Sequence, residues 1–439
     1  MQQLGPLPLH PIVTVAVSGG PDSLALTLLA ARWCQRQNIR LLALIVDHKL
    51  RSSSTSEANT VAGWLRSRGI EHRILTWTHD AQLHGSRADG SRLVPALQAR
   101  ARTERYRLLT EGARQAGAIT LLLGHTADDQ LETTAMRSTR QEDGDGLAGM
   151  AAVQPRGDVL VCRPLLSFAR ARVQATAPAF GLTPLQDPSN RDHRFERVRV
   201  RAALAHAPEQ RSALKDKAHR VSADRRRREQ AVAELFAASA LLHREGYATV
   251  DRSALSAADW QTAAGLTSAL LASVGGARYP ADRSAVDALL MWCGEAEVTG
   301  ASQRTLAGCV IRRRRHHLLI ARELAGVAAS TPAGSLTNTE LRWDGRWRIT
   351  PPIQANMERW AVKPLGAVDK DRLPRALQAL PMIVRSTLPT LVDQHGVHLL
   401  PLFLSTATWP TGSFVTQFAP VHPVARGPFA VVSDKVALI

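Results

Sequence analysis

Residues 12–30 read IVTVAVSGGPDSLALTLLA, and this stretch decides the fold. Ile12 to Val17 is an almost continuous apolar run rich in β-branched residues, which is typical of a buried parallel strand. Leucines at helical spacing follow from Leu24 and predict a helix. The turn between them is rich in glycine, so backbone N–H groups and the positive end of the helix can approach a phosphate. We therefore expect a nucleotide site, although the same residue types also form ordinary strand-to-helix turns.

The turn itself, residues 18–23, reads SGGPDS. It is neither a Walker loop, which needs a lysine before its final serine or threonine, nor the dinucleotide motif GxGxxG. It resembles the SGGxDS signature of the PP-loop ATP pyrophosphatases, which cleave ATP between its α and β phosphates. The resemblance implies that the turn holds the pyrophosphate, with the nucleotide-binding residues Ser18, Gly19, Gly20, Pro21, Asp22 and Ser23.

Asp22 is the informative residue of the turn. A carboxylate beside a polyphosphate is repelled by it unless a cation lies between the two groups. Mg²⁺ is the cation that carboxylates and substrate phosphates commonly hold together. Asp22 therefore predicts a magnesium ion at this turn.

Apolar runs that alternate with helical patterns predict an α/β fold with a mostly parallel, doubly wound sheet. Strands are expected over residues 12–17, 39–46, 72–77 and 118–123, and helices over 57–68 and 93–116. Ligands of such sheets lie at the carboxyl ends of the strands. Besides the turn at Ser18, Asp47 with His48 and then His125 fall at such ends.

A cluster of acidic residues follows the fourth predicted strand, in the stretch GHTADDQLET of residues 124–133. If a helix begins near Ala127, Asp128 and Glu132 share one face because they are four residues apart, and Asp129 lies one step round. So much negative charge needs a cation or a substrate amine to compensate it. Capping and charge at a helix N-terminus is the alternative, and it explains one or two acids well.

The composition indicates a globular chain, with 45% hydrophobic and 21% charged residues over 439 positions, enough for two or three domains. We find no apolar run of membrane-spanning length and no secretory signal, and expect a soluble, cytoplasmic protein. The four cysteines form no C-x-x-C pair that could hold zinc, an iron–sulfur cluster or a redox couple. They are expected to be reduced core residues.

A net charge of +17 favours a polyanionic partner, although 49 arginines against 6 lysines can also reflect genome composition. The charge concentrates in residues 191–228, where 13 Lys or Arg accompany 5 Asp or Glu. RNA backbone is the predicted partner of this segment, and a solvated helix face is the alternative. The predicted RNA-binding residues are Arg197, Arg199, Arg201, Arg225, Arg226, Arg227 and Arg228.

Seven motifs in this order resemble the tRNA(Ile)-lysidine synthetase family. They are SGGPDS, VDHKLR (46–51), ARTERY (101–106), GHTADDQLET (124–133), GLAGM (146–150), RPLL (163–166) and DPSN (187–190). The chain departs from the family pattern at residues 141–143, where a Gly-Ser-Gly-like stretch is usual, and at Arg197-Val198, where Arg-Asn is common. These departures touch loop contacts and leave the phosphate and metal groups intact.

The resemblance implies a two-step ligation that uses ATP and Mg²⁺. The C2 carbonyl oxygen of the wobble cytidine in tRNA(Ile), with the anticodon CAU, attacks the α-phosphate of ATP and releases pyrophosphate. The amine of free lysine then displaces AMP from C2 and forms lysidine. The implied catalytic residues are Asp22, Arg102, His125, Asp128, Asp129 and Glu132, and the implied metal ligands are Asp22, Asp128 and Asp129.

Several of these roles remain open between neighbours. Arg102 or Arg105 would clamp phosphate. Glu132 or Asp129 would bind the lysine ammonium and accept a proton. Asp47 and His48 would contact the adenosine, as nucleotide-binding residues. His125 would orient the base or touch a phosphate, with a packing histidine as the alternative.

The rest of the chain suggests two further domains. Residues 230–292 look helical, two apolar runs at 305–311 and 318–320 around a basic turn suggest a β-hairpin, and 331–339 reads as a linker. We expect a PP-loop, Rossmann-like catalytic domain over 1–205, a basic, largely helical tRNA-binding middle domain over 206–328, and a small C-terminal α+β domain over 336–439 that also contacts tRNA. The oligomeric state stays open, with a homodimer as one alternative.

Three other functions compete with the ligase. A PP-loop tRNA 2-thiolase carries paired cysteines for sulfur or a cluster, and this chain has none. Glutamine-using synthetases need an amidotransferase domain, for which the residues before Ile12 leave no room. A non-catalytic tRNA-binding protein would not need the intact acidic residues of the turn and of residues 128–132.

Overall fold

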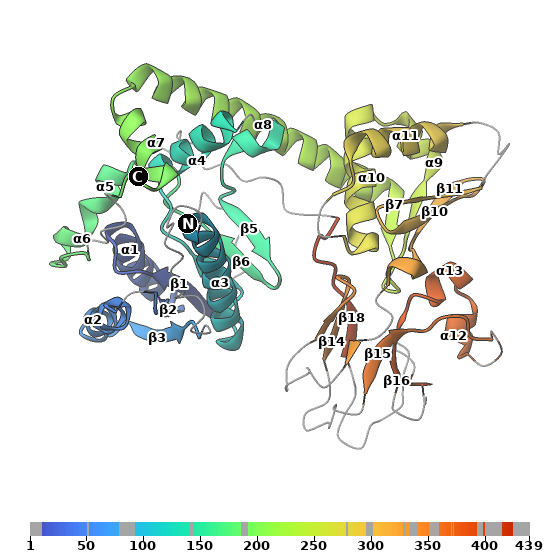
Figure 1. The fold of residues 1–439 in the computed structure, drawn as a ribbon, viewed down its shortest axis with the longest axis horizontal. Helices are drawn as coiled ribbons and strands as arrows, with labels where there is room; N and C mark the ends of the chain where they lie inside the picture. The colour runs from blue at the N-terminus through green and yellow to red at the C-terminus, as the bar shows by residue number, and fades with distance from the viewer. Residues whose placement is uncertain are drawn as a thin grey trace. The chain divides into compact units, whose positions relative to one another are not determined.

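The fold is described from a computed structural model of the chain. It describes residues 11–50, 52–78, 93–140, 144–185, 192–277, 280–295, 302–327, 331–332, 341–350, 360–369, 371, 373–392, 398–399 and 415–424. These residues form two compact units, one ending at Arg226 and one beginning at Arg227 (Figure 1). That boundary lies inside the helix α8 (Pro208–Ser239). The expected division into three domains stays a prediction.

The first unit is built on a six-stranded sheet with the order β3-β2-β1-β4-β6-β5. Its strands are β1 (Ile12–Val17), β2 (Arg40–Asp47), β3 (Glu71–Thr76), β4 (Thr120–Leu122), β5 (Val153–Arg156) and β6 (Val159–Cys162). Neighbouring strands run parallel, except that β5 pairs antiparallel with β6. The predicted mostly parallel sheet is confirmed, and its first four strands are the four that the apolar runs predict.

The strand β1 shows why the sheet is covered on both faces. All six of its residues are buried. Val15 and its alternate neighbours pack in one core, whereas Ile12 and Ala16 pack in a second core on the other face. A strand that is covered on both faces needs residues suited to burial at every position. The apolar run meets this need, and its one polar residue, Thr14, donates its hydroxyl to the Thr120 carbonyl.

Helices cover the two faces of this sheet (Figure 1). The helices of the first unit are α1 (Pro21–Gln37), α2 (Ser54–Arg66), α3 (Leu93–Gln115), α4 (Ala127–Thr139), α5 (Arg170–Gln174), α6 (Thr176–Ala179) and α7 (Glu196–Ala205), with a 3₁₀ turn η3 (Gly144–Ala148). Apolar side chains of α1, α2, α5 and α6 join the core of Val15, and those of α3 join the core of Ile12.

The second unit contains three sheets. The first has the order β7-β8-β11-β10-β9, from β7 (Ala240–Leu242), β8 (Ala248–Asp251), β9 (Gln303–Leu306), β10 (Cys309–Arg313) and β11 (His317–Arg322). The others are β12-β15-β16-β17 and β13-β14-β18, from β12 (Thr331–Pro332), β13 (Leu341–Trp343), β14 (Trp347–Thr350), β15 (Ala361–Pro364), β16 (Pro389–Val392), β17 (His398–Leu399) and β18 (Val415–Phe418). Its helices are α9 (Arg252–Ala257), α10 (Trp260–Gly275), α11 (Arg283–Gly294), α12 (Arg375–Gln378) and α13 (Met382–Arg385), with the 3₁₀ turn η5 (Leu324–Gly326).

Two local predictions for this unit need correction. Residues 230–292 are not all helical, because β7 and β8 pair with each other around a turn at Gly246, which has a φ of 78°. The predicted hairpin exists as β10 and β11, but the run 305–311 is not one strand. Ala307 and Gly308 both take positive φ values, 51° and 72°, and turn the chain from β9 into β10. A two-residue turn of this kind joins antiparallel strands.

A buried ion cluster joins two sheets of the second unit. Asp344, in the turn between β13 and β14, accepts hydrogen bonds from Arg322 of β11 at 2.8 and 3.1 Å and from Arg346 at 2.7 Å. Arg346 is completely buried, and burial lowers its pKa to about 10 although Asp344 acts in the opposite direction. A charge buried this deeply is tolerated because its partner is beside it.

Two expectations from composition concern the whole chain. All four cysteines are free and buried, as expected of reduced core residues. Among the helices that the structure describes, none has the length and apolar composition that a membrane span requires.

Candidate active site

The predicted phosphate-binding turn joins β1 to α1 and is closed by hydrogen bonds within it. The backbone N–H of Ser18 donates to the Ser23 hydroxyl at 3.1 Å, and that hydroxyl donates to the Gly20 carbonyl at 3.0 Å. Gly20 is the N-cap of α1 and has no side chain to cap its first turn. The first N–H groups of α1 therefore have no competing side-chain cap at the positive end of the helix, where an anion can bind.

Two glycines let other segments approach this turn closely. Gly19 has a φ of 81°, and a Cβ there would lie 2.7 Å from side-chain atoms of Val61 and Leu185. A Cβ on Gly124, after β4, would lie 3.0 Å from the Asp22 carbonyl oxygen. A larger residue at Gly124 would crowd this backbone oxygen. The glycine thus lets the acidic residues that follow β4 lie directly beside the phosphate-binding turn.

Asp22 is the carboxylate of this turn. Burial raises its pKa from 3.8 to about 6, and the nearby Arg170 offsets only part of that shift. Its Oδ1 atom is buried and has no hydrogen-bond partner. A buried carboxylate oxygen without a partner is unfavourable. The Oδ1 atom of Asp22 is therefore available to coordinate a cation.

The donor set fits Mg²⁺ at Asp22 but less well elsewhere. A hard oxygen ligand with an unused position is what Mg²⁺ takes from a protein, the remaining ligands being phosphates and water. The oxygens of Asp128 and Asp129 already accept hydrogen bonds from this chain. Within the part of the chain that the structure describes, no group of three or more His, Cys, Asp or Glu is arranged to hold a metal.

The acidic cluster begins α4, which starts at Ala127 as predicted. Thr126 and Asp129 form a capping box, in which Asp129 Oδ2 accepts from the Thr126 N–H at 2.8 Å and from its hydroxyl at 2.9 Å. The capping alternative thus explains one oxygen of Asp129. It does not explain the other acidic side chains of the cluster.

Arginines of the chain compensate the remaining negative charge. Arg170 contacts Asp129 at 2.9 Å and Glu132 at 2.8 Å, and its Nε lies 3.9 Å from Asp22. Arg197 and Arg201 of α7 pair with Glu132, and Arg211 of α8 pairs with Asp128, each at 2.8 Å, while Arg197 also lies 3.4 Å from Asp129. Four carboxylates, those of Asp22, Asp128, Asp129 and Glu132, thus meet four guanidinium groups.

Glu132 is the most enclosed acid of the cluster, only 2% exposed. Its Oε1 accepts from Arg170 and Arg201, and its Oε2 from Arg197 and, at 3.4 Å, from Arg201. Burial raises its pKa, but the hydrogen bonds from these arginines outweigh burial and leave the pKa below its ordinary value. The four acceptor positions of the carboxylate are therefore occupied.

The sequence predicted the acids and missed two of their partners, Arg170 and Arg211. The excess of acidic residues over 128–132 indicated that a cation was needed, but no spacing rule identifies one that lies 38 residues away from Glu132. Arg197 and Arg201, predicted to bind RNA, bind Glu132 in this structure. Their predicted contact with RNA stays a prediction.

His125 lies next to the cluster as a neutral side chain. Burial, and then the charge of Arg163, lower its pKa to about 3. Its Nδ1 atom is buried and has no hydrogen-bond partner. A neutral imidazole with an unused ring nitrogen can donate to or accept from a substrate.

The remaining predicted nucleotide contacts differ in their surroundings. Arg102 is exposed and lies over the Tyr106 ring at 5.5 Å, whereas burial lowers the pKa of Arg105. Asp47 is 2% exposed, and its carboxylate accepts from the Lys49 N–H and from the Thr55 hydroxyl. Asp47 therefore ties the end of β2 to α2.

The other predicted RNA-binding residues lie on α7 and α8. Arg199 donates to the carbonyls of His193 and Arg194, both at 2.9 Å. Arg225 is half-buried with its Nε 4.0 Å from Asp145, while Arg226, Arg227 and Arg228 are exposed. The end of this basic run thus presents its positive charge to solvent.

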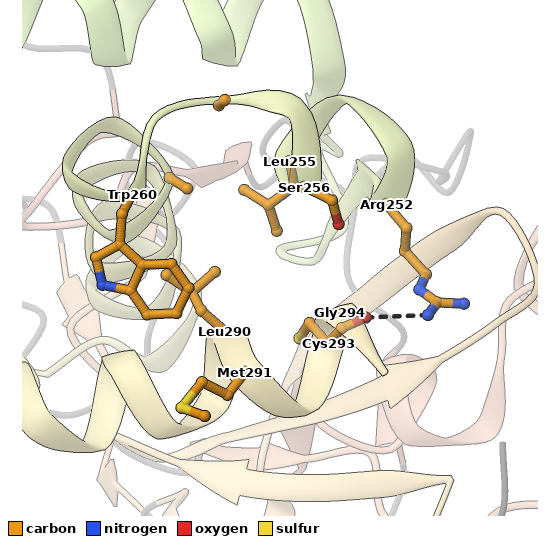
Figure 2. Close-up of a pocket in the computed structure, with 10 residues that line it drawn as sticks. Arg252, Leu255, Ser256, Trp260, Leu290, Met291, Cys293 and Gly294 are labelled. Atoms are coloured by element: carbon orange, nitrogen blue, oxygen red, sulfur yellow. Dashed lines mark hydrogen bonds between the residues drawn. The ribbon is translucent and has the colours of Figure 1, made fainter. Parts of the chain in front are cut away.

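A pocket in the second unit is lined by none of the predicted site residues. Figure 2 shows Trp260, Leu290 and Met291 along it, with Arg252 opposite, whose guanidinium donates to the Cys293 carbonyl at 3.0 Å. Its volume is about 180 Å³. Pockets that bind small molecules have volumes of roughly 300 Å³ or more, so this pocket is too small for a nucleotide.

Comparisons with known proteins show which family the chain belongs to. A family described as a PP-loop domain matches residues 2–207. The tRNA(Ile)-lysidine synthase of Mesorhizobium japonicum is 34% identical over 94% of this chain and 91% of its own length, and that of Ruegeria pomeroyi is 34% identical over 80% and 79%. The tRNA(Ile)-lysidine synthase of Bradyrhizobium sp. is 44% identical over 44% of this chain and about half, 51%, of its own length. A solved structure, the U34-tRNA thiolase NcsA from Methanococcus maripaludis, is similar at 18% identity with a TM-score of 0.42, covering 50% of this chain and 75% of its own.

A doubly wound parallel sheet whose first strand ends in SGGPDS, with an acidic helix start beside that turn, defines a PP-loop ATP pyrophosphatase. Among proteins of that class, the relatives that match along nearly the whole chain share one name. The chain belongs to the tRNA(Ile)-lysidine synthase family.

Proposed function

We propose that the chain attaches lysine to C2 of the wobble cytidine in tRNA(Ile) with the anticodon CAU, using ATP, and so forms lysidine. One observation carries the proposal beyond family membership. The phosphate-binding turn and the acidic helix start, which the sequence predicts separately, belong to one side-chain network, because Arg170 lies 3.9 Å from Asp22 and 2.9 Å from Asp129. An ATP-binding group and amine-binding groups side by side suit a ligation that activates an oxygen and then replaces it with an amine.

In the first step, the C2 oxygen of cytidine attacks the α-phosphorus of ATP, and the bond to the β-phosphate breaks. The turn of residues 18–23 holds the departing pyrophosphate with backbone N–H groups and the hydroxyls of Ser18 and Ser23. Asp22 is the residue proposed to hold Mg²⁺, which would neutralise the charge that builds on the phosphates. The exposed guanidinium of Arg102 suits phosphate binding.

In the second step, the lysine amine attacks C2, and the bond from C2 to the AMP oxygen breaks. The amine must first lose a proton, since an ammonium has no lone pair for attack. Asp129 and Glu132 are the proposed binding groups for the ammonium. Because guanidinium groups occupy Glu132 on all sides, the ammonium enters by replacing one of them. Arg197 and Arg201 are the candidates to leave, since RNA phosphates would attract them.

The proposed reaction belongs in the cytoplasm, where tRNA, ATP and free lysine occur together. His125, neutral and with an unused ring nitrogen, is proposed to orient the cytidine rather than to carry charge. Asp47 and His48 remain the proposed neighbours of the adenosine at the end of β2.

Attachment of radiolabelled lysine to a tRNA(Ile) transcript with the anticodon CAU tests the proposal. The wild-type chain should attach lysine only when ATP is present. Asp22→Ala should abolish the attachment, because the variant lacks the carboxylate that faces the phosphates. Asp158→Ala, at an exposed turn between β5 and β6, is the matched control and should keep the wild-type rate. Incorporation of sulfur without any lysine would overturn the ligase in favour of a thiolase.

A further inference from the structure

Arg170 occupies a fixed place against the first turn of α4. Its backbone N–H donates to Asp128 Oδ2 at 2.6 Å. Two residues earlier, the Phe168 carbonyl accepts from the Ala127 N–H at 3.0 Å. The chain that leaves β6 is therefore held to the start of α4 by one main-chain hydrogen bond and by one from the main chain of Arg170 to the Asp128 side chain, neither of which involves the side chain of Arg170.

The guanidinium of Arg170 joins acids that have different proposed tasks. Its Nη1 donates to Glu132 at 2.8 Å and its Nη2 to Asp129 at 2.9 Å, which are charge-assisted hydrogen bonds. Its Nε lies 3.9 Å from Asp22, within range of an ion pair only. The side chain of Arg170 is 15% exposed, so these charges interact with little screening by water.

The four acids depend on Arg170 to different degrees. Glu132 has Arg197 and Arg201 as further partners, and Asp129 has Arg197 at 3.4 Å, but these two arginines are the ones proposed to leave for RNA, so Arg170 would be the partner that remains to both acids. Asp22 meets Arg170 only at 3.9 Å, without a hydrogen bond, and so depends less on the orientation of its guanidinium. The planar, rigid fork of an arginine can span such a set, whereas a glutamine cannot replace its charge.

We propose that Arg170 is a positioning residue of the ligase site, whose guanidinium fixes Asp129 and Glu132, on the lysine side, relative to Asp22, on the phosphate side. This inference rests on the proposed function. Arg170 would thereby set the distance between the lysine amine and the adenylated base. It also predicts unequal effects on the two steps, since the contacts to Asp129 and Glu132 are hydrogen bonds and the one to Asp22 is a longer ion pair.

Kinetics of both steps in Arg170→Gln test the inference. Adenylation of tRNA is followed without lysine, from ATP labelled at the α-phosphate, and ligation is followed with labelled lysine. We expect the KM for lysine to rise and kcat/KM for lysine to fall about 10- to 100-fold, the range that misplacement of a reacting group by about 1 Å causes. Adenylation should fall no more than about threefold.

Two further variants make the result specific. Arg170→Lys keeps the positive charge but not the fork of donors, and should recover part of the loss in lysine kcat/KM. Arg172→Gln, on the same helix and exposed, with only a ring contact to Phe168, should behave as wild type. A parallel fall in both steps with an unchanged KM for lysine would show a purely structural role and overturn the inference. So would a lysine variant no better than the glutamine variant.

The wild-type assay separates this inference from the proposed function. If wild-type protein attaches no lysine, the proposed function fails and the role of Arg170 with it. If wild-type protein attaches lysine and Arg170→Gln attaches it with unchanged constants, only the positioning role fails. Thermal unfolding of all variants, followed by circular dichroism, shows that each rate is measured on folded protein.

Discussion

Burial raises the pKa of two carboxylates in the same cluster, yet their net pKa shifts have opposite signs. Burial dominates at Asp22 and raises its pKa to about 6, since Arg170 lies only at ion-pair distance. At Glu132 burial acts in the same direction, but hydrogen bonds from arginines outweigh it and lower the pKa. The ionised form of Asp22, beside the phosphate-binding turn, is thus disfavoured in the folded protein, whereas the ionised form of Glu132 is stabilised. Perturbed carboxylates of the first kind are typical of functional sites.

Asp22→Asn should therefore stabilise the free protein at pH 8. Because the folded-state pKa of about 6 lies above the ordinary 3.8, the folded chain binds this proton more tightly than the unfolded chain. The group consequently lowers stability progressively as the pH rises from about 4 to 6. Urea unfolding in the absence of magnesium should show a gain of about 1–3 kcal/mol at pH 8 and none at pH 3.5. A loss at pH 8 would contradict the uncompensated state of Asp22.

Glu132→Gln should act in the opposite sense. Its lowered pKa contributes stability that is present above about pH 4.5 and is lost as the pH falls. At pH 8 the variant leaves guanidinium groups of Arg170, Arg197 and Arg201 without their carboxylate, which should cost about 3 kcal/mol or more. Near pH 3.5 the difference from wild type should shrink. An unchanged difference between these two pH values would refute the ionised, paired state of Glu132.

The sequence predicts acids of the site better than it predicts their partners. Asp22 follows from a turn motif, and Asp128 and Glu132 from i, i+4 spacing, which are local rules. Arg170 stands on a separate short helix and reaches the cluster only through the tertiary fold. The excess of acidic residues indicates that a cation is needed, but only the tertiary fold determines which basic residue lies near enough to supply it.

Helices and strands set by local sequence are predicted well, whereas strands that depend on long-range pairing are not. The boundaries of β1 and the start of α4 match the predictions because an apolar run and a helix start are local signals. The strands β7 and β8 lie in an alanine-rich stretch that looks helical, and pairing with each other and with β11 overrides the local preference. Short strands stabilised by their neighbours cannot be predicted from composition alone.

The helix α8 carries the basic run 225–228, and we expect its four arginines to contribute to tRNA binding. Replacing these four arginines with glutamine should weaken tRNA binding and reduce the slope of log K against log salt by about 1–3, since each lost phosphate contact removes about 0.7–0.9. ATP binding should not change. Filter binding at several salt concentrations measures the slope.

The control for this variant is Arg107→Gln with Arg114→Gln on α3, whose charges are already paired with Glu104 and Glu111. This pair should leave the slope unchanged. An unchanged slope in the α8 variant as well would assign the run 225–228 to a solvated face.

At the scale of the whole molecule, all four thiols are shielded. Burial raises the pKa of Cys34 and Cys293 to about 11 and that of Cys162 and Cys309 to about 12. Since the thiolate is the reactive form, Ellman's reagent should detect almost no thiol in native protein at pH 8 and four after unfolding. A native thiol that reacts within seconds would reopen the sulfur-transfer alternative.

The ion cluster of Asp344 limits how the second unit could evolve by recombination. Arg322 comes from the strand β11, whereas Asp344 and Arg346 both come from the turn between β13 and β14. A chimaera that exchanged residues from 331 onward with a distant relative would bury Arg322 opposite whatever that relative carries at this turn. Without a carboxylate there, a guanidinium would remain buried without a counter-charge. The two sheets that this cluster joins should therefore be exchanged together in any chimaera, although the predicted boundary at residues 328–336 divides them.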